Sequence, residues 1–163
     1  MKRLLTTLVI LTGLFGSGGA VWAQDFDKAL KASQSGDFAT ALKHWKPLAE
    51  QGDASAQYHL GVMYRKGNGV TKDYGEAVKW YRKAVEQGYA DAQNNLGLMC
   101  FEGRGVLQDT IAAHMWFYIA AANGNTNAEE NRDIVAGELS SSDILKAQKR
   151  AKRCMSSGYK ECD

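Results

Sequence analysis

Residues 60–88 read LGVMYRKGNGVTKDYGEAVKWYRKAVEQG, and residues 96–124 read LGLMCFEGRGVLQDTIAAHMWFYIAAANG. The two stretches align without a gap at an offset of 36 residues. Identical residues recur at the opening leucine–glycine pair, at the Gly-x-Gly-Val turn, and at the aspartate and tryptophan that follow. This regular register indicates an internal repeat, and repeats of about 20–50 residues are typical of stacked architectures.

The first half of each repeat predicts a helix. Ala56, Leu60 and Tyr64 recur every four residues, as the apolar stripe of a helix does. Gly61 has no side chain, so we expect a neighbouring helix to approach closely there. Residues 67–69, Gly-Asn-Gly, predict the end of the helix, because glycine accepts the left-handed conformation of a C-terminal cap.

The second half predicts another helix. Asp73 is expected to be its N-cap, with Glu76 completing a capping box. Gly88 marks its end. The apolar stripe between them consists of Ala77, Trp80, Tyr81 and Ala84. At this helical spacing we interpret the tryptophans as core residues, with ligand stacking as the alternative: Trp45, Trp80 and Trp116.

This pattern resembles the Sel-one-like repeat (SLR), a relative of the tetratricopeptide repeat. The resemblance implies an all-α fold, a right-handed α-solenoid of stacked antiparallel helix pairs with about three and a half units and a C-terminal capping helix. It also implies a protein or peptide partner and no cofactor. First helices line the groove in such stacks, and the register then predicts six groove residues: Tyr58, Val62, Arg65, Asn94, Leu98 and Phe101. The alternative is that the end helices cover these side chains.

The boundaries follow the repeat. We expect a signal peptide over 1–23, a tetratricopeptide-like N-terminal capping unit over 24–52, repeats over 53–88 and 89–124, and a partial repeat with a capping helix and disulfide tail over 125–163. Pro47 falls inside a predicted helix, where it removes one hydrogen bond and should bend the axis. Arg132 and Asp133 stand where the repeat has its leucine–glycine pair. End units often depart from the consensus in this way.

The N-terminus has the pattern of a secretory signal. Lys2 and Arg3 precede an apolar run over 4–15, and Val21-Trp22-Ala23 predicts cleavage after Ala23. A retained membrane anchor is the alternative, although about 20 apolar residues are needed to span a bilayer. The leader holds two of the 20 Lys and Arg residues and none of the 18 Asp and Glu, so residues 24–163 carry no net charge. A neutral chain argues against nucleic acid as a partner.

Export predicts an oxidising compartment, in which cysteines pair. Cys154 and Cys162 are eight residues apart, with a turn-forming segment between them, and we expect a disulfide. Two thiols or a metal pair are the alternatives, and no histidine is near in sequence to support the metal. Cys100 falls at a core position of the repeat, where we expect a buried thiol that acts as a small hydrophobic residue.

No catalytic or metal-binding motif stands out. The histidines lack metal spacing and are interpreted as structural: His44, His59 and His114. A Ser-x-x-Lys sequence, the arrangement of β-lactamases, occurs only at Ser157–Lys160, without a Lys-Thr-Gly motif after it.

The sequence therefore predicts a periplasmic adaptor, with secretion as the second choice, that binds a protein or peptide, has no integral membrane span after cleavage, and is not an enzyme. The alternatives are an envelope hydrolase, as some relatives are labelled, or a structural accessory that uses its basic last helix: Lys146, Lys149, Arg150, Lys152 and Arg153.

Overall fold

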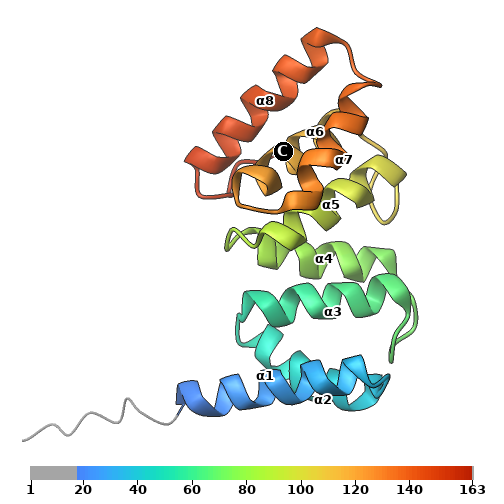
Figure 1. The fold of residues 1–163 in the computed structure, drawn as a ribbon, viewed down its shortest axis with the longest axis vertical. Helices are drawn as coiled ribbons and strands as arrows, with labels where there is room; N and C mark the ends of the chain where they lie inside the picture. Colours follow the sequence, from blue (N-terminus) through green and yellow to red (C-terminus); the bar gives the residue numbers. More distant parts are fainter. Residues whose placement is uncertain (1–17, 163) are drawn as a thin grey trace, which may run out of the picture.

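The computed structural model describes residues 18–162, which form eight α-helices and no strand (Figure 1). The all-α class is thus confirmed. Residues 1–17 of the predicted signal peptide lie outside the described residues, and the first helix includes positions 18–23. The helices are α1 Gly18–Gln34, α2 Phe38–Glu50, α3 Ala54–Lys66, α4 Tyr74–Val85, α5 Ala90–Glu102, α6 Thr110–Ala122, α7 Thr126–Ala136 and α8 Ser141–Ser156.

The helices stack as pairs along the long axis of the molecule (Figure 1). Within the pairs, α1 packs on α2, α3 on α4 and α5 on α6. Between the pairs, α2 packs on α3, α4 on α5 and α6 on α7. We call α1, α3, α5 and α7 the first helices, and α2, α4, α6 and α8 the second helices. This arrangement is the α-solenoid that the repeat predicted, because one helix pair buries its apolar face only against its neighbours.

The leucine–glycine pair positions the second helix within each repeat. A Cβ atom at Gly61 would lie 2.6 Å from the ring of Tyr81, and one at Gly97 would lie 2.7 Å from the ring of Phe117. Both aromatic side chains are at most 1% exposed. Glycine at these two positions therefore lets an aromatic ring pack directly on the backbone of the first helix.

The Gly-x-Gly turns also join one unit to the next. Gly69 and Gly105 have φ angles of 72° and 73°, a left-handed conformation that favours glycine. A Cβ atom at Gly69 would lie 2.8 Å from that of Phe38, at the start of α2. A Cβ atom at Gly105 would collide with the carbonyl oxygen of Tyr74, at the start of α4. Each turn thus rests on the second helix of the preceding unit.

The predicted capping box at α4 has only one of its two hydrogen bonds. The side chain of Asp73 accepts a hydrogen bond from the backbone N–H of Glu76 at 2.9 Å, as an N-cap does. The backbone N–H of Asp73 donates to the carbonyl of Tyr64 at 3.0 Å, so it does not need a side-chain acceptor. The Glu76 carboxylate pairs with Lys79 instead.

Two of the three tryptophans lie in the core as predicted. Trp45 is 1% exposed and Trp116 is 6% exposed. Trp80 is only half-buried, and the Lys83 ammonium lies 4.1 Å from the centre of its ring. Pro47 does not end α2, which continues to Glu50 with the proline ring exposed.

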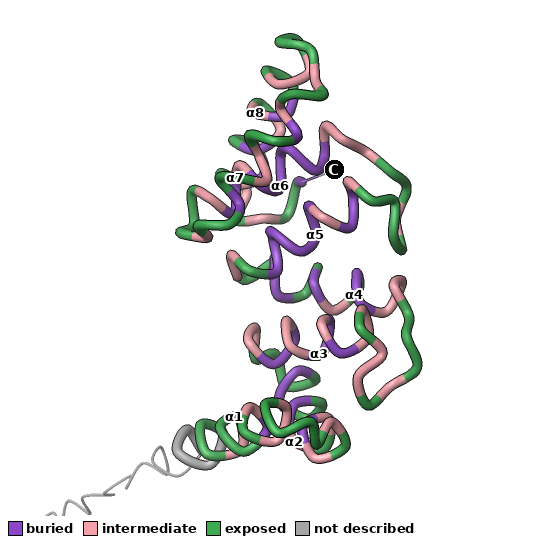
Figure 2. The backbone as a smooth tube through the Cα atoms, turned by 45° about the vertical axis from the view of Figure 1, so that its right-hand side comes forward, coloured by how far each residue is buried: buried purple, intermediate pink, exposed green. Residues whose placement is uncertain are grey.

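The C-terminal unit departs from the paired arrangement. α8 packs on α6 and hardly contacts α7, with Ala147, Ala151 and Cys154 as its buried residues. Arg132 and Asp133 of α7, which replace the leucine–glycine pair, form an ion pair with each other at 2.8 Å. Without a glycine to pack against, α8 has no close approach to α7. α5 is buried along most of its length, whereas the outer faces of α7 and α8 are exposed (Figure 2).

His114 makes the stability of the fold depend on pH. The side chain is 2% exposed, and its Nδ1 atom has no hydrogen-bond partner among the described residues. Burial, and then the nearby Arg132 guanidinium, lower the pKa of His114 below 6.5. The unfolded chain therefore takes up a proton at a higher pH than the folded chain does, and folding stability falls as the pH drops below about 6.5.

We expect His114→Leu to reduce this loss of stability. Urea unfolding at about pH 7.5 and about pH 5 would give the free energy of unfolding of both chains. The wild type should lose more of it on acidification than the variant. His59, whose pKa is also lowered by burial, contributes in the same direction in both chains. Equal losses in the two chains would contradict a neutral, buried His114.

Candidate protein-binding surface

The six predicted groove residues lie on two neighbouring first helices, three on α3 and three on α5. Tyr58, Val62, Leu98 and Phe101 are half-buried apolar side chains that pack against the core. Arg65 is also half-buried, whereas Asn94 is buried. We call the four apolar side chains the apolar row. The row is continuous with the core and still partly exposed, as surfaces that receive a partner often are.

Aromatic contacts fix the α3 end of the apolar row. The ring of Tyr58 lies 5.3 Å from that of Tyr89 and 6.1 Å from that of Tyr81, between centroids. Burial raises the pKa of Tyr58, and it raises the pKa of Tyr81 to about 12. Both phenols therefore stay neutral. Asn95 donates a hydrogen bond to the Tyr81 hydroxyl at 3.3 Å, which ties α5 to α4 beneath the row.

An end helix covers Asn94, one of the predicted groove residues. Its side chain is 8% exposed, and its amide oxygen accepts a hydrogen bond from the side chain of Asn131 on α7 at 2.9 Å. Of the two alternatives for the predicted groove, covering by an end helix therefore applies here. The sequence did not indicate this contact, because α7 carries little of the repeat motif. The contact of Tyr89 with Tyr58 was not predicted either, because the equivalent position in the preceding unit is Asp53.

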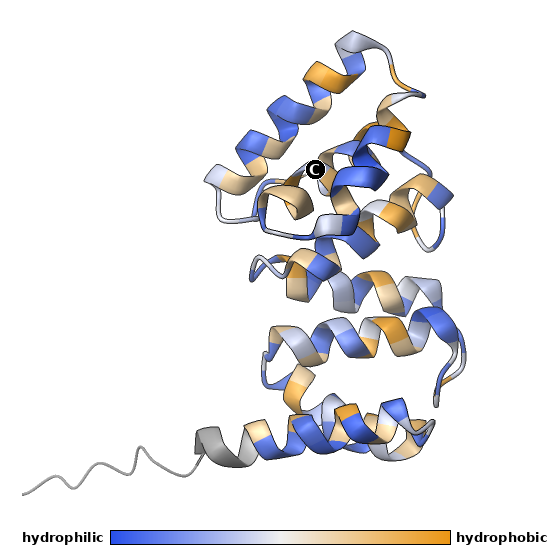
Figure 3. Ribbon diagram, viewed as in Figure 1, coloured by the Kyte–Doolittle hydropathy of each residue, from blue (hydrophilic) through white to orange (hydrophobic). Residues whose placement is uncertain are grey.

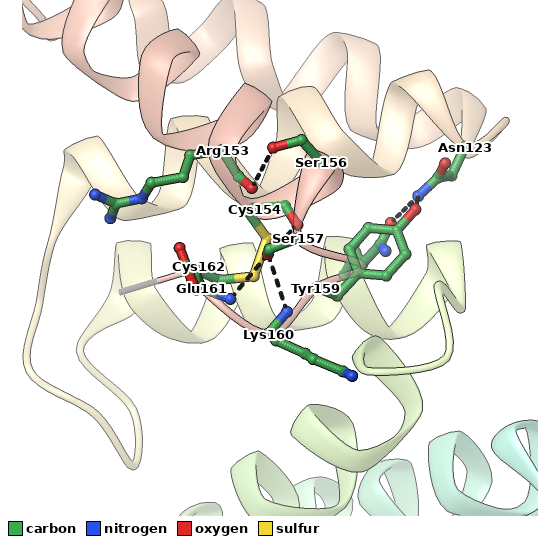
Figure 4. The surroundings of a disulfide bond; sticks show 10 residues. Asn123, Arg153, Cys154, Ser156, Ser157, Tyr159, Lys160, Glu161 and Cys162 are labelled. Carbon is green, nitrogen blue, oxygen red and sulfur yellow. Dashed lines mark hydrogen bonds between the residues drawn. A yellow bond between two sulfur atoms is a disulfide. The ribbon is translucent and has the colours of Figure 1, made fainter.

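The side chains considered for catalysis make structural contacts. The Ser157 hydroxyl donates to the carbonyl of Cys154 at 2.8 Å and accepts from the backbone N–H groups of Lys160 and Glu161 at 3.2 and 3.0 Å (Figure 4). It therefore holds a turn. The ring of His59 stacks on Trp45 at 4.3 Å between centroids. Within residues 18–162, His, Cys, Asp and Glu side chains form no cluster of three that could hold a metal ion.

The predicted disulfide joins Cys154 at the end of α8 to Cys162 in the tail (Figure 4). The tail also has an anchor that the sequence did not indicate. The Tyr159 hydroxyl accepts a hydrogen bond from Asn123, at the end of α6, at 2.8 Å. Its ring lies against Gly88, after α4, where a Cβ atom would approach it to 3.0 Å. The tail thus connects α8 with the ends of α6 and α4.

Cys100 is 7% exposed, as expected for a core residue.

The basic last helix is not uniformly solvated. Arg150 is half-buried, and its guanidinium lies 3.7 Å from the Asp109 carboxylate in the turn before α6. Lys146, Lys149 and Lys152 are exposed. With Ser142, Leu145, Arg150 and Arg153, the first two of these lysines line an open depression along α8. The outer surface of α8 therefore differs in charge from the apolar row.

These features define an α-helical repeat protein. The chain belongs to the Sel1 repeat family, whose model matches residues 32–53, 54–89 and 90–125, more than half of its length. Sel1 repeats generally mediate protein–protein interactions. In the described residues, no helix combines the length and apolar character needed to cross a membrane.

Among the solved structures with similar folds are two repeat proteins. One is a protective antigen of uropathogenic Escherichia coli that displays an SLR fold, with 27% identity, a TM-score of 0.79, and coverage of 85% of this chain and 31% of that one. The other is a Sel1 repeat protein from Oxalobacter formigenes, with 33% identity, a TM-score of 0.62, and coverage of 72% and 51%. The chain thus spans about a third and about half of these proteins. None of the curated proteins matches it significantly.

Proposed function

We propose that this chain is an exported, non-catalytic adaptor that binds a segment of another protein along the apolar row. The observation that carries the proposal is the position of Tyr58, Val62, Leu98 and Phe101, which contact the core on one side and remain partly exposed on the other. Apolar side chains placed in this way can be buried further by a partner. The likeness to the Sel1 repeat family supports a protein as that partner.

The proposed location is the periplasm, with secretion into the medium as the second choice. The signal pattern over 1–23 supports export. The Cys154–Cys162 disulfide also supports it, because disulfides persist in oxidising compartments and are rare in the cytosol. A neutral chain after residue 23 fits a protein partner better than a polyanion.

Replacement of the apolar row should abolish binding. The purified chain would be immobilised and exposed to an envelope extract of its host, and captured proteins would be quantified by mass spectrometry. Leu98→Asp with Phe101→Asp should lower recovery of the specific partner at least tenfold, because two buried carboxylates would lack counter-charges. Leu107→Asp is the control for an added carboxylate, since Leu107 is 90% exposed in the turn after α5 and is not part of the row.

Thermal unfolding of each variant must accompany this comparison, since both replaced side chains contact the core. A variant that stays folded at the binding temperature and captures the same proteins as the wild type would refute the apolar row as the binding surface. If Leu107→Asp also loses capture, the partner contacts a surface outside the apolar row. The peptide derived from the captured partner can then be titrated against both chains.

A further inference from the structure

The last two helices expose charges of opposite sign. Glu129, Glu130 and Asp133 are exposed on α7, at spacings that place them on one side of the helix. We call them the acidic face. Lys146, Lys149 and Lys152 are exposed on α8 and form the basic face. Along most of α8 the ribbon has the colour of hydrophilic residues (Figure 3). Among residues 18–162, no ion pair involves Glu129, Glu130, Lys146 or Lys149.

Both faces lie on helices that lack a usual neighbour of the stack. Every other first helix packs on the second helix of its own unit, but α7 hardly contacts α8. Within residues 18–162, a first helix of the next unit packs on each of α2, α4 and α6, whereas α8 has no such contact. Two of the three large hydrophobic residues that are exposed in the described chain adjoin these faces: Ile134 of α7 at 58% and Leu145 of α8 at 52%.

We propose that a second copy of this chain occupies both faces at once. In a twofold arrangement, the acidic face of one copy lies on the basic face of the other, and the reverse contact forms by symmetry. Each copy then places α7 against the basic face of its partner, and α8 against the acidic face of its partner. The contact also covers Ile134 and Leu145. Because residues 24–163 have no net charge, long-range repulsion does not oppose the pairing.

Charge reversal on one helix at a time tests the pairing. The acid-reversed chain carries Glu129→Lys with Glu130→Lys, and the base-reversed chain carries Lys146→Glu with Lys149→Glu. Sedimentation equilibrium of the full chain in low salt should show a dimer for the wild type. Each reversed chain should dimerise at least tenfold more weakly, because like charges would then meet at both contacts. Added salt should weaken the wild-type dimer.

Mixing the two reversed chains gives the decisive comparison. An equimolar mixture should form a heterodimer, since α7 of each chain then meets an α8 of opposite charge. The control chain carries Lys31→Glu with Lys43→Glu, exposed on α1 and α2, and has the same net charge as the base-reversed chain. It should not associate with the acid-reversed chain. The control thus distinguishes a specific contact between α7 and α8 from general attraction between oppositely charged chains.

A wild type that remains monomeric at a concentration of about 100 μM would overturn the proposal, because even a weak dimer forms at that concentration. So would a dimer that survives both reversals, or a mixture that fails to associate while circular dichroism shows both chains folded. Vesicles with anionic headgroups provide the last arm of the test. Binding to them by a monomeric wild type, lost only in the base-reversed chain, would assign the basic face to a membrane instead of a second copy.

Discussion

Phe117→Ala should lower the free energy of unfolding by about 3–5 kcal/mol, the range found when a fully buried aromatic side chain is truncated. Phe117 is 1% exposed and packs on the backbone of α5 at Gly97. Its loss removes a buried contact between α5 and α6 and leaves a cavity between them. Chemical denaturation followed by circular dichroism measures the effect. Leu107→Ala, at a side chain that is 90% exposed, should change stability by less than about 0.5 kcal/mol.

Gly97→Ala tests the same contact from the other helix. Alone, it should destabilise by about 1–3 kcal/mol, because its Cβ atom would lie 2.7 Å from the Phe117 ring. In the Phe117→Ala background it should become neutral or stabilising, since alanine favours helix over glycine by about 1 kcal/mol. This change of sign is the expected signature of two residues in contact. Additive effects would show that Gly97 is required for another reason.

Removal of the disulfide should cost about 2–4 kcal/mol, the usual range for a loop of this size. The chain with both Cys154→Ala and Cys162→Ala lacks the covalent link between α8 and the tail. Unfolding should then begin at α8, because the tail holds that helix to the ends of α6 and α4 through Tyr159. Hydrogen exchange of the α8 amides, compared with those of α5, would locate the loss.

Reduction provides the matched control for this pair of substitutions. A reductant should bring the wild type close to the stability of the cysteine-free tail and leave that variant unchanged. Alkylation in denaturant should modify one cysteine, Cys100, before reduction and three after it. Three modified cysteines without reductant would contradict the disulfide. A wild type that is insensitive to reductant, with the disulfide demonstrably broken, would show instead that Tyr159 and the turn hold the tail by themselves.

The repeat units could be predicted from the sequence because their information is local. Periodic apolar residues, N-cap aspartates and turn glycines each specify a helix or its end within a few residues. The recurrence of Leu-Gly and of an aromatic residue at a fixed distance then determines how the two helices meet. The position of the apolar row followed from that register, and its residues lie half-buried against the core. The disulfide was predictable because its cysteines flank a short turn.

The end of the stack could not be predicted in the same way. α7 carries Arg132 and Asp133 at the positions of the leucine–glycine pair. The repeat pattern therefore does not predict which helix α8 contacts. Its packing on α6 joins helices that α7 separates in the sequence, and the cover over Asn94 and the anchor at Tyr159 join residues 37 and 36 positions apart. The helices and the repeat could thus be predicted from the residues alone. The faces that stay exposed at the C-terminal end of the stack depend on which helix α8 packs against. Because that helix, α6, is distant in the sequence, the exposed faces could be identified only in the three-dimensional structure.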